Sequence, residues 1–255
     1  MKYILVTGST EGLGLAAARS LMDEGYEVIL HARSSSRSAA LAAIAPRSAG
    51  VVIGDLGSVE ETRSVAQQVN RIGRMHAVIH NAGTYGESRR NSTPEGHAQI
   101  LAVNTLAPYM LTALIERPKR LIYLSSSMHR GAGTSLRDID WVERRWDRDS
   151  AYSESKLYVT ALALSVARLW PDVLSSAVDP GWVPTRMGGP NAPDDLTQGY
   201  LTQTWLAVSE DAAARVSGGY WYHRVQQKST PEALDPDFQD RLMARLAELT
   251  GISLL

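Results

Sequence analysis

Tyr152 and Lys156 stand four residues apart in the chain, a spacing that could serve proton transfer. One turn of α-helix takes about 3.6 residues, so side chains at this spacing project from the same helix face. A phenol, with a pKa of about 10, exchanges protons poorly at neutral pH, but a neighbouring ammonium group favours its ionised form. Because the same spacing also occurs by chance on solvated helices, its meaning depends on the rest of the chain.

A glycine-rich turn, Thr7-Gly8-x-x-x-Gly12-x-Gly14, lies between an apolar run at 2–7 and a helical pattern at 12–24. Glycine lets the backbone turn tightly and approach a pyrophosphate, and the N-terminus of the following helix favours the phosphate charge. The spacing differs from the G-x-G-x-x-G of the commonest dinucleotide fold. An ordinary strand-to-helix turn is the alternative, so this feature also needs support from elsewhere.

Short apolar runs alternate with segments of helical periodicity, which is typical of βαβ units and a parallel sheet. Thr93-Pro94-Glu95 resembles an N-cap with proline at the first helical position. No linker or internal repeat divides the chain, so residues 1–255 are expected to form one doubly wound α/β domain. Strands are predicted at 2–7, 26–31, 50–54, 76–80, 119–125, 173–179 and 218–222, and helices near 12–24, 35–45, 58–72, 94–116, 150–170, 194–209 and 235–249.

Composition and charge narrow the classes of function. A net charge of −1 over 255 residues offers no electrostatic basis for binding nucleic acid or an anionic membrane surface. The absence of cysteine excludes disulfides, thiolate catalysis and cysteine-ligated metals. The six histidines lack metal-ligand spacing, so no metal is expected. The first apolar run is too short to span a membrane, and a cytoplasmic location is predicted.

Six motifs occur in the order in which short-chain dehydrogenases/reductases carry them, and the chain resembles this family over roughly residues 2 to 222. Residues 93–96, 103–106 and 151–157 are most similar to its retinol-dehydrogenase-like branch. The resemblance implies a Rossmann-type sheet of about seven strands in three α/β/α layers, an NAD(P) cofactor, and a homodimer or homotetramer. The motifs are the glycine-rich turn, Asn81-Ala82-Gly83, Asn104, Ser125-Ser126-Ser127, Tyr152-x-x-x-Lys156 and Pro180-Gly181.

The resemblance also implies an activity, the reversible transfer of hydride between NADP(H) and a carbonyl or alcohol substrate. Ser126 is expected to polarise the carbonyl oxygen and Tyr152 to exchange the proton, while Lys156 holds the ribose and lowers the tyrosine pKa. Asn104 is expected to bend its helix and hold a water of the proton relay. Ser127, one position further on, is the alternative to Ser126.

Two alternative functions stay open at this point. One is a protein that senses NADP(H) without catalysis, whose usual mark would be a broken Tyr/Lys pair. The other is an isomerase or dehydratase on the same scaffold, which would not consume the cofactor stoichiometrically.

The choice of cofactor depends on the end of the second predicted strand, where dinucleotide folds contact the adenosine ribose. An acid there would bind the ribose hydroxyls, whereas a guanidinium would pair with a 2′-phosphate. Ala32 occupies the acid position and Arg33 the basic one, which favours NADP(H). Arg37 either assists or is an exposed helix charge. Glu11 replaces the basic residue that many NADP-preferring relatives carry in the glycine-rich turn, so NAD(H) remains an alternative.

The remaining candidate residues also follow from the resemblance. Asp55 is expected either to bind the adenine or to cap the next helix. Asp179 stands where other residue types are more usual, and no role is assigned to it. The residues expected to bind the cofactor are Gly8, Thr10, Gly12, Leu13, Gly14, Arg33, Asp55, Leu56, Asn81, Ala82, Gly83, Tyr152, Lys156, Pro180, Gly181, Val183 and Thr185.

Two long connections, 127–151 and 184–209, are expected to form the walls of the substrate pocket. Trp141 and Trp146 lie among charged residues in the first, for which a solvated surface helix at 140–149 is the alternative. The second has the loop and short helix of a lid. The C-terminal segment, with Phe238 and three leucines at helical spacing, is expected to form a last helix or to cap the pocket.

Overall fold

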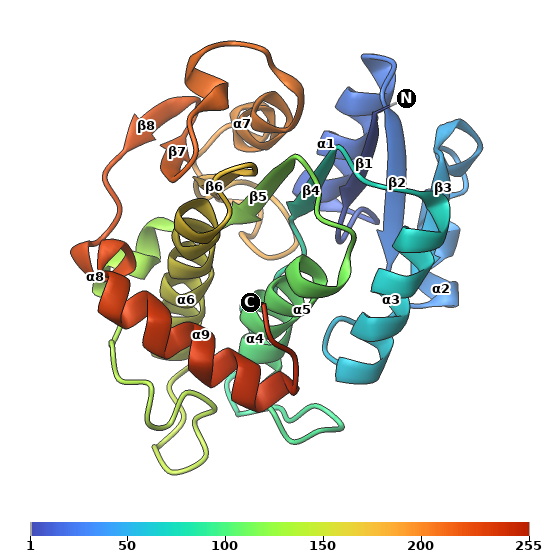
Figure 1. Cartoon of the computed structure of the whole chain (residues 1–255). Helices are drawn as coiled ribbons and strands as arrows, with labels where there is room; N and C mark the ends of the chain where they lie inside the picture. Colours follow the sequence, from blue (N-terminus) through green and yellow to red (C-terminus); the bar gives the residue numbers. More distant parts are fainter. Residues whose placement is uncertain (1, 255) are drawn as a thin grey trace.

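An eight-stranded sheet crosses the molecule in the order β3-β2-β1-β4-β5-β6-β7-β8 (Figure 1). The computed structural model describes residues 2–254, and within them each neighbouring pair of strands is parallel except β7 with β8. This confirms the predicted doubly wound sheet of Rossmann type. The strands are β1 (Tyr3–Val6), β2 (Glu27–Ala32), β3 (Gly50–Ile53), β4 (Ala77–His80), β5 (Arg120–Leu124), β6 (Leu174–Asp179), β7 (Gly219–Tyr222) and β8 (Val225–Gln227).

The seven predicted strands all form, and β8 is an additional one. His223 and Arg224 join β7 to β8 and both have positive φ, +48° and +62°, as a tight hairpin turn requires. Neither residue is the glycine or asparagine that usually marks such a turn, and β8 is short and exposed. The sequence pattern therefore carried no signal for it.

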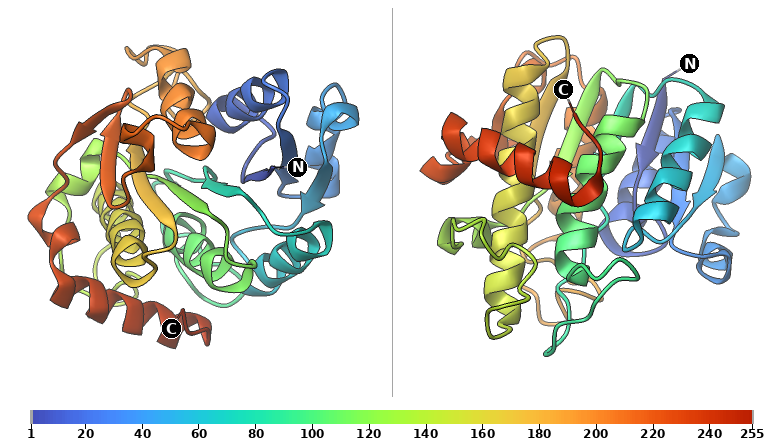
Figure 2. Two further views of the ribbon diagram at one scale, coloured as in Figure 1. Left: turned by 45° about the horizontal axis from the view of Figure 1, so that its top comes forward. Right: turned by 60° about the horizontal axis from the view of Figure 1, so that its bottom comes forward.

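Helices cover both faces of the sheet and give three layers (Figure 2). On one face α1 packs against α7; on the other lie α3, α5 and α6, with α9 packed on the outer side of α6. The helices are α1 (Gly12–Asp23), α2 (Ser35–Ser38), α3 (Val59–Ile72), α4 (Gln99–Leu101), α5 (Ala107–Leu114), α6 (Arg148–Leu169), α7 (Leu196–Val208), α8 (Pro231–Leu234) and α9 (Pro236–Thr250). Between α4 and α5 the chain forms a π-helical turn, η3 (Ala102–Leu106), and short 3₁₀ turns are η1 (Ala39–Leu41), η2 (Ala45–Arg47), η4 (Ser127–Gly131) and η5 (Ala213–Arg215).

Two predicted helices differ from the structure. The segment 35–45 is broken into α2 and short 3₁₀ turns. The helix predicted from 94 starts only at Gln99, so the N-cap prediction at Thr93-Pro94-Glu95 was wrong. Residues 94–96 form a turn closed by a bridge between Ser92 and Ala98. Glu95 instead serves another helix, because its Oε1 accepts hydrogen bonds from Val59 N and Ser58 Oγ at the start of α3.

Helix α6 lies in the hydrophobic core. Every residue from Ala151 to Val166 is buried, because the sheet, α9 and the segment before α6 surround it. A helix enclosed on all sides keeps its polar side chains only where they have a function or a partner. Tyr152 and Lys156 lie on this helix, next to the carboxyl ends of β4, β5 and β6.

The connection 132–147 is irregular and is anchored to α6. The solvated helix considered for 140–149 does not form: Trp141 is buried and its ring meets that of Trp146 edge-on, with centroids 5.8 Å apart. Arg144 pairs with the buried Glu154 carboxylate through two nitrogens at 2.8 Å, and the Trp141 indole donates to the same carboxylate at 2.9 Å. These contacts fix the loop against the helix.

The predicted C-terminal helix forms as α9, and its Phe238, Leu242 and Leu246 side chains are buried in the core. The chain end is held as well, since the Tyr109 hydroxyl donates to the Ile252 carbonyl. Among residues 2–254, none of the helices has the length and apolar character needed to cross a bilayer.

Candidate functional site

A cavity of about 360 Å³ opens at the carboxyl edge of the sheet, between the glycine-rich turn and α6. Its walls come from the ends of β1, β2, β4 and β5 and from the segment after β6. We refer to it as the glycine-turn cavity. This edge is where open α/β sheets bind ligands. Tyr152 and Lys156 both line it, so the two motifs that the sequence singled out first meet in one cavity.

Tyr152 and Lys156 are 8% and 5% exposed. Lys156 Nζ donates to the Leu124 carbonyl at 2.8 Å and lies 5.5 Å from the centre of the Tyr152 ring. Burial lowers the pKa of the ammonium to about 8, and the Asp179 carboxylate acts in the opposite direction. Burial raises the pKa of the Tyr152 phenol, against a hydrogen bond with Ser126 that lowers it. The Tyr85 ring packs edge-on against Tyr152, at 4.6 Å between centroids.

The three consecutive serines have different environments. Ser125 is buried and its hydroxyl lies 2.6 Å from the Thr160 hydroxyl, a contact internal to the core. Ser126 is half-buried, caps η4 by accepting from Met128 N, and reaches the Tyr152 hydroxyl. Ser127 is exposed. Of the three serines, Ser126 is therefore the one whose hydroxyl lies beside the Tyr152 hydroxyl and could bind a substrate oxygen there.

Asn104 lies in the π-helical turn and is buried. Its amide nitrogen donates to the Thr84 carbonyl at 2.9 Å and contacts Ser155 Oγ at 3.0 Å, and its oxygen accepts from Thr84 N at 2.8 Å. A Cβ placed on Gly83 would lie 3.4 Å from the Asn104 oxygen and 3.6 Å from Lys156 Nζ. Gly83 therefore leaves a small space between Asn104 and Lys156.

The glycine-rich turn fits closely against its neighbours. A Cβ on Gly14 would lie 2.3 Å from the Gly8 carbonyl oxygen and 2.4 Å from Asn81 Nδ2. Asn81 Nδ2 donates to the carbonyls of Thr7 and Gly8, which ties the turn to β4. Gly8 and Gly12 have φ of +67° and +57°, the left-handed region that glycine enters without strain. This turn, followed at once by the N-terminus of α1, fits a dinucleotide pyrophosphate.

Two arginines and one acid stand at the β2 side of the cavity. Arg33 is exposed and forms no ion pair or hydrogen bond with any residue between 2 and 254. Arg37 instead contacts Glu11, with its Nη2 2.9 Å from Oε2, and Arg186 lies 4.0 Å from the other carboxylate oxygen. The acid that counted against NADP(H) is thus paired with two cations, while Arg33 stays free.

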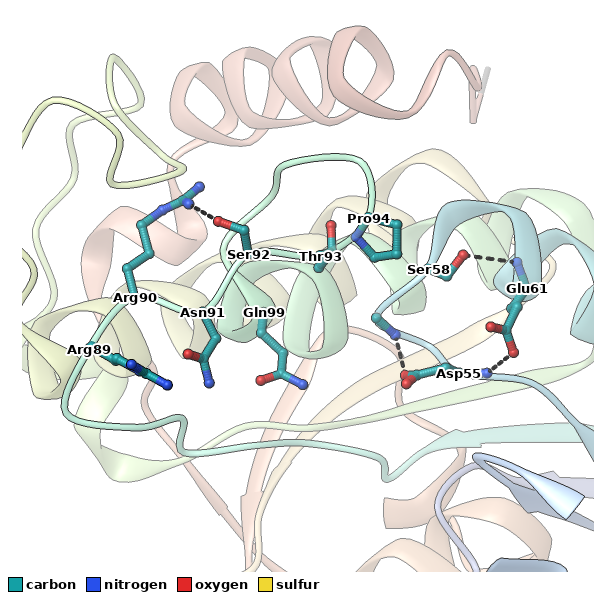
Figure 3. A pocket seen from close by; sticks show the side chains of 11 residues that line it. Asp55, Ser58, Glu61, Arg89, Arg90, Asn91, Ser92, Thr93, Pro94 and Gln99 are labelled. Carbon is teal, nitrogen blue, oxygen red and sulfur yellow. Dashed lines mark hydrogen bonds between the residues drawn. The ribbon is translucent and has the colours of Figure 1, made fainter. Parts of the chain in front are cut away.

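Asp55 belongs both to the glycine-turn cavity and to a second hollow of about 570 Å³ beside it (Figure 3). The helix after it is capped by Ser58, so the alternative that Asp55 caps this helix was wrong. Asp55 Oδ1 accepts from Gly57 N at 2.8 Å, and Asp55 N donates to Glu61 Oε2 at 2.7 Å, as Figure 3 shows. The backbone is held in place, and the carboxylate points into the hollow.

Most of the predicted residues line the glycine-turn cavity, but four do not. Ser126 bonds with the Tyr152 hydroxyl and Asn104 with the backbone of Thr84, and both Tyr152 and Thr84 line the cavity. Gly181 lies in the turn after β6, and Val183 is buried against Gly199. The predicted residues that line it are Gly8, Thr10, Gly12, Leu13, Gly14, Arg33, Asp55, Leu56, Asn81, Ala82, Gly83, Tyr152, Lys156, Pro180 and Thr185.

Other residues line the cavity although they were not among those expected to bind the cofactor; of these, only Arg37 and Glu11 were considered from the sequence, both in the choice between NADP(H) and NAD(H). Some are neighbours of predicted positions, such as Thr84 and Val103, and spacing alone could have suggested them. In the sequence His31 has no feature that distinguishes it from an ordinary polar residue. Its position under the glycine-rich turn results from the pairing of the strands, which the sequence does not show. The full set is Glu11, His31, Arg37, Thr84, Gln99, Val103, Leu124, Ser125, Arg186 and Met187.

Comparison with known proteins agrees with this geometry. Residues 2–125 match the model of the short chain dehydrogenase family. The chain is 40% identical to a short-chain dehydrogenase of Penicillium rubens, over 100% of this chain and 99% of the relative. It is 28% identical to retinol dehydrogenase 13 of Homo sapiens, over 98% of this chain and 85% of that protein.

Solved structures show the same fold. An uncharacterised protein from Mycobacterium paratuberculosis superimposes with a TM-score of 0.83 at 23% identity, covering 100% of this chain and 95% of that one. Further structures of this fold, with TM-scores of 0.67–0.69 and 18–22% identity, are complexes with NADP or NADPH. Taken with the ordered motifs and the buried Tyr152–Lys156 pair, the full-length relatives show that this chain belongs to the short-chain dehydrogenase/reductase family, in its retinol-dehydrogenase-like branch.

Proposed function

We propose that this protein is an NADP(H)-preferring oxidoreductase that interconverts a carbonyl group and an alcohol, with Asn104, Ser126, Tyr152 and Lys156 as its catalytic residues. The observation that carries the proposal is the single cavity that extends from the glycine-rich turn to the buried Tyr152–Lys156 pair. A nicotinamide dinucleotide held at the turn would reach the tyrosine from within that cavity.

The residues have distinct roles in the proposed reaction. When bound, the cofactor supplies or accepts a hydride. The Ser126 hydroxyl, next to the phenol, would hold the substrate oxygen while charge develops on it. Tyr152 would deliver the proton in the reductive direction and accept it in the oxidative one. Lys156 Nζ, fixed by the Leu124 carbonyl, would stabilise negative charge on the phenol.

Asn104 would complete the proton path. Its side chain faces Lys156 Nζ across the space that Gly83 leaves open. Its amide is held by Thr84 on both its oxygen and its nitrogen, so its position is fixed before any substrate enters. The proposed role is to orient a water that passes protons to Lys156.

The preference for NADP(H) rests on the free guanidinium of Arg33 and on the pairing of Glu11. A 2′-phosphate is recognised best by an arginine that has no competing carboxylate. Among residues 2–254, Arg33 meets this condition, and Arg37 and Arg186 pair with the acid that would otherwise repel the phosphate. The NADP and NADPH complexes among structures of the same fold support this preference.

The cofactor preference is tested by fluorescence titration with NADPH and NADH. We expect tighter binding of NADPH, and an Arg33→Asp variant in which NADPH affinity falls at least tenfold while NADH affinity is kept or improved. Arg137→Asp is the matched control, because it makes the same substitution at an arginine whose side chain is 85% exposed, and it should change neither affinity. Tighter binding of NADH by the unmodified protein would overturn the proposed preference.

The activity is tested with a panel of aldehydes, ketones and aromatic carbonyls, followed by the loss of NADPH absorbance. Because the chain is similar to a protein named retinol dehydrogenase 13, the panel should include retinal. Tyr152→Phe should reduce turnover by about 10²–10⁴-fold while cofactor binding remains. Binding of NADPH without turnover on any member of the panel would favour the sensing alternative.

A further inference from the structure

Asp179 places a buried carboxylate beside the proposed active site. It is the last residue of β6 and is 6% exposed. Side chains alternate between the faces of a strand. Ala177 packs in the core on the α6 side of the sheet and Val178 in the core on the α1 side, so Asp179 faces α6. This is the face that carries Tyr152 and Lys156.

The Asp179 carboxylate is held in one orientation by two hydrogen bonds. Its Oδ1 accepts from Gly181 N at 3.0 Å, and its Oδ2 accepts from the Tyr220 hydroxyl on β7 at 3.1 Å. Burying a carboxylate costs free energy unless hydrogen bonds or an opposite charge compensate it. Hydrogen bonds compensate part of this cost, and a cation is therefore expected nearby.

Lys156 is the buried cation at the same edge of the sheet. Its Nζ donates to the Leu124 carbonyl, and Leu124 pairs with Val178, the residue directly before Asp179. The ammonium thus contacts the end of β5, and the carboxylate stands at the end of the neighbouring strand β6. No salt bridge joins them; the carboxylate acts on the ammonium at longer range, and since both side chains are buried, their charges are screened less than in water.

We propose that Asp179 is a positioning residue of the active site, acting as the counter-charge that keeps the Lys156 ammonium and the Tyr152 phenol in the protonated forms needed for carbonyl reduction. The proposal rests on the proposed function. Asn at this position would preserve the shape and can still accept the hydrogen bond from Gly181 N, while its Nδ2 can only donate to the Tyr220 hydroxyl, and the charge is lost.

The electrostatic environment supports this role. Asp179 raises the pKa of Lys156 against the effect of burial, and it raises the pKa of Tyr152 in the same direction as burial does. Other titratable groups also act on or near this carboxylate: Tyr220 and Tyr222 from β7 and His129 from η4. The Arg130 guanidinium lies over the Tyr220 ring, 5.2 Å from its centre. His129 is held neutral, since burial lowers its pKa, its Nε2 accepts from Thr230 N and its Nδ1 donates to the Ser126 carbonyl.

The direction of the effect follows from these charges. Loss of the Asp179 charge lets Lys156 and Tyr152 lose their protons at lower pH. Both changes remove the protonated forms that reduction uses. In the reductive reaction they therefore act together, and the alkaline limb of the pH profile must move toward lower pH.

The test is the pH dependence of kcat/KM for carbonyl reduction in Asp179→Asn. We expect its alkaline limb to lie about one pH unit below that of the unmodified enzyme, with rates at pH 6 within about threefold of each other. Tyr220→Phe removes a hydrogen bond of Asp179 but keeps the charge, and it should leave the limb in place. An unchanged limb in Asp179→Asn, in an enzyme that turns over, would overturn the proposal.

A second measurement does not depend on turnover. The chain has four lysines, Lys2, Lys119, Lys156 and Lys228, so NMR of protein labelled with ¹³C at lysine Cε gives few signals to assign. The Lys156 signal should titrate at lower pH in Asp179→Asn, while the other three keep their titration. An unchanged Lys156 titration midpoint in Asp179→Asn would contradict the proposal even if no substrate is found. If the midpoint does move to lower pH but no substrate is turned over, the result counts against the proposed function and not against the role of Asp179.

Discussion

The backbone N–H of Gly8 donates a hydrogen bond to Nδ1 of His31 over 2.9 Å. Nε2 of the same ring lies 2.9 Å from the Gly54 carbonyl, so a neutral ring with its proton on Nε2 satisfies both contacts. Burial lowers the pKa of His31, which favours this neutral form. One side chain therefore joins the glycine-rich turn to the strand ends of β2 and β3.

His31→Phe is predicted to weaken both the fold and cofactor binding. The ring volume stays, but the partly buried Gly8 N–H loses its acceptor; a fully buried donor left unsatisfied costs about 1–3 kcal/mol, so a loss toward the lower end of that range is expected. Urea unfolding and NADPH titration measure the two effects. His31→Asn is the conservative comparison, because its amide oxygen can take the place of Nδ1, and it should retain more affinity. Equal NADPH affinity in the Phe variant and the unmodified protein would show that the contact does not matter.

Acid is predicted to destabilise the fold below about pH 6.5, the ordinary pKa of histidine. Burial lowers the pKa of His76 to about 4 and that of His80 to about 3. The unfolded chain then binds more protons than the folded one, so the stability present above pH 6.5 is lost as pH falls toward these values. Urea unfolding between pH 8 and pH 4 measures the slope.

His80→Phe isolates the contribution of one ring, since His80 stacks on Tyr123 with 4.6 Å between ring centres. This variant should show a smaller loss of stability between pH 6.5 and pH 4 than the unmodified protein. The same slope in both proteins would assign the acid sensitivity to other groups.

Three serine-to-alanine variants are predicted to behave differently. Ser126→Ala should lower kcat by about 10²-fold, since it removes a donor beside Tyr152. Ser125→Ala should mainly lower stability, because its hydroxyl bonds with Thr160 inside the core. Ser127→Ala, at an exposed position, should change neither. Steady-state kinetics and thermal unfolding of the three proteins give the comparison, and a large kinetic defect in the Ser127 variant would move the proposed role to that residue.

Arg144→Met is predicted to destabilise the protein by about 2–3 kcal/mol, because Glu154 is then a buried carboxylate without its cation. The figure lies below the range for fully buried pairs, since the Arg144 side chain is 35% exposed. Adding Glu154→Gln removes the unpaired charge and should restore part of the loss. Urea unfolding of both singles and the double variant measures the coupling; additive effects would mean that the two side chains act independently.

The parts of the fold set by local pattern were predictable. Apolar runs located seven strands, because a buried parallel strand needs little besides continuous apolar side chains. The start of the helix before Asn104 was not, since the Thr93-Pro94-Glu95 pattern fits a cap locally while Glu95 caps α3 instead. A cap signal shows that a side chain can accept from a helix, without showing which helix.

Within the site, motif order identified the residues that meet in the cavity, but not their partners. The pairing of Glu11 with Arg37 and Arg186 joins three separate segments, so no spacing rule reveals it. The environment of Asp179 likewise depends on the pairing of β5, β6 and β7. Charges whose effect depends on tertiary contacts need the structure.

The π-helical turn at Ala102–Leu106 contains one residue more than an α-helical turn would. At about 100° per residue, that residue rotates everything after it relative to everything before it. Asn104 can therefore point at Thr84 and Ser155 while Tyr109 and Met110, further along, still point into the core. The extra residue changes the rotational setting of α5 relative to Asn104, so that both can face their partners at once. Deleting one residue in this turn would rotate Tyr109 and Met110 away from the core or Asn104 away from Thr84 and Ser155.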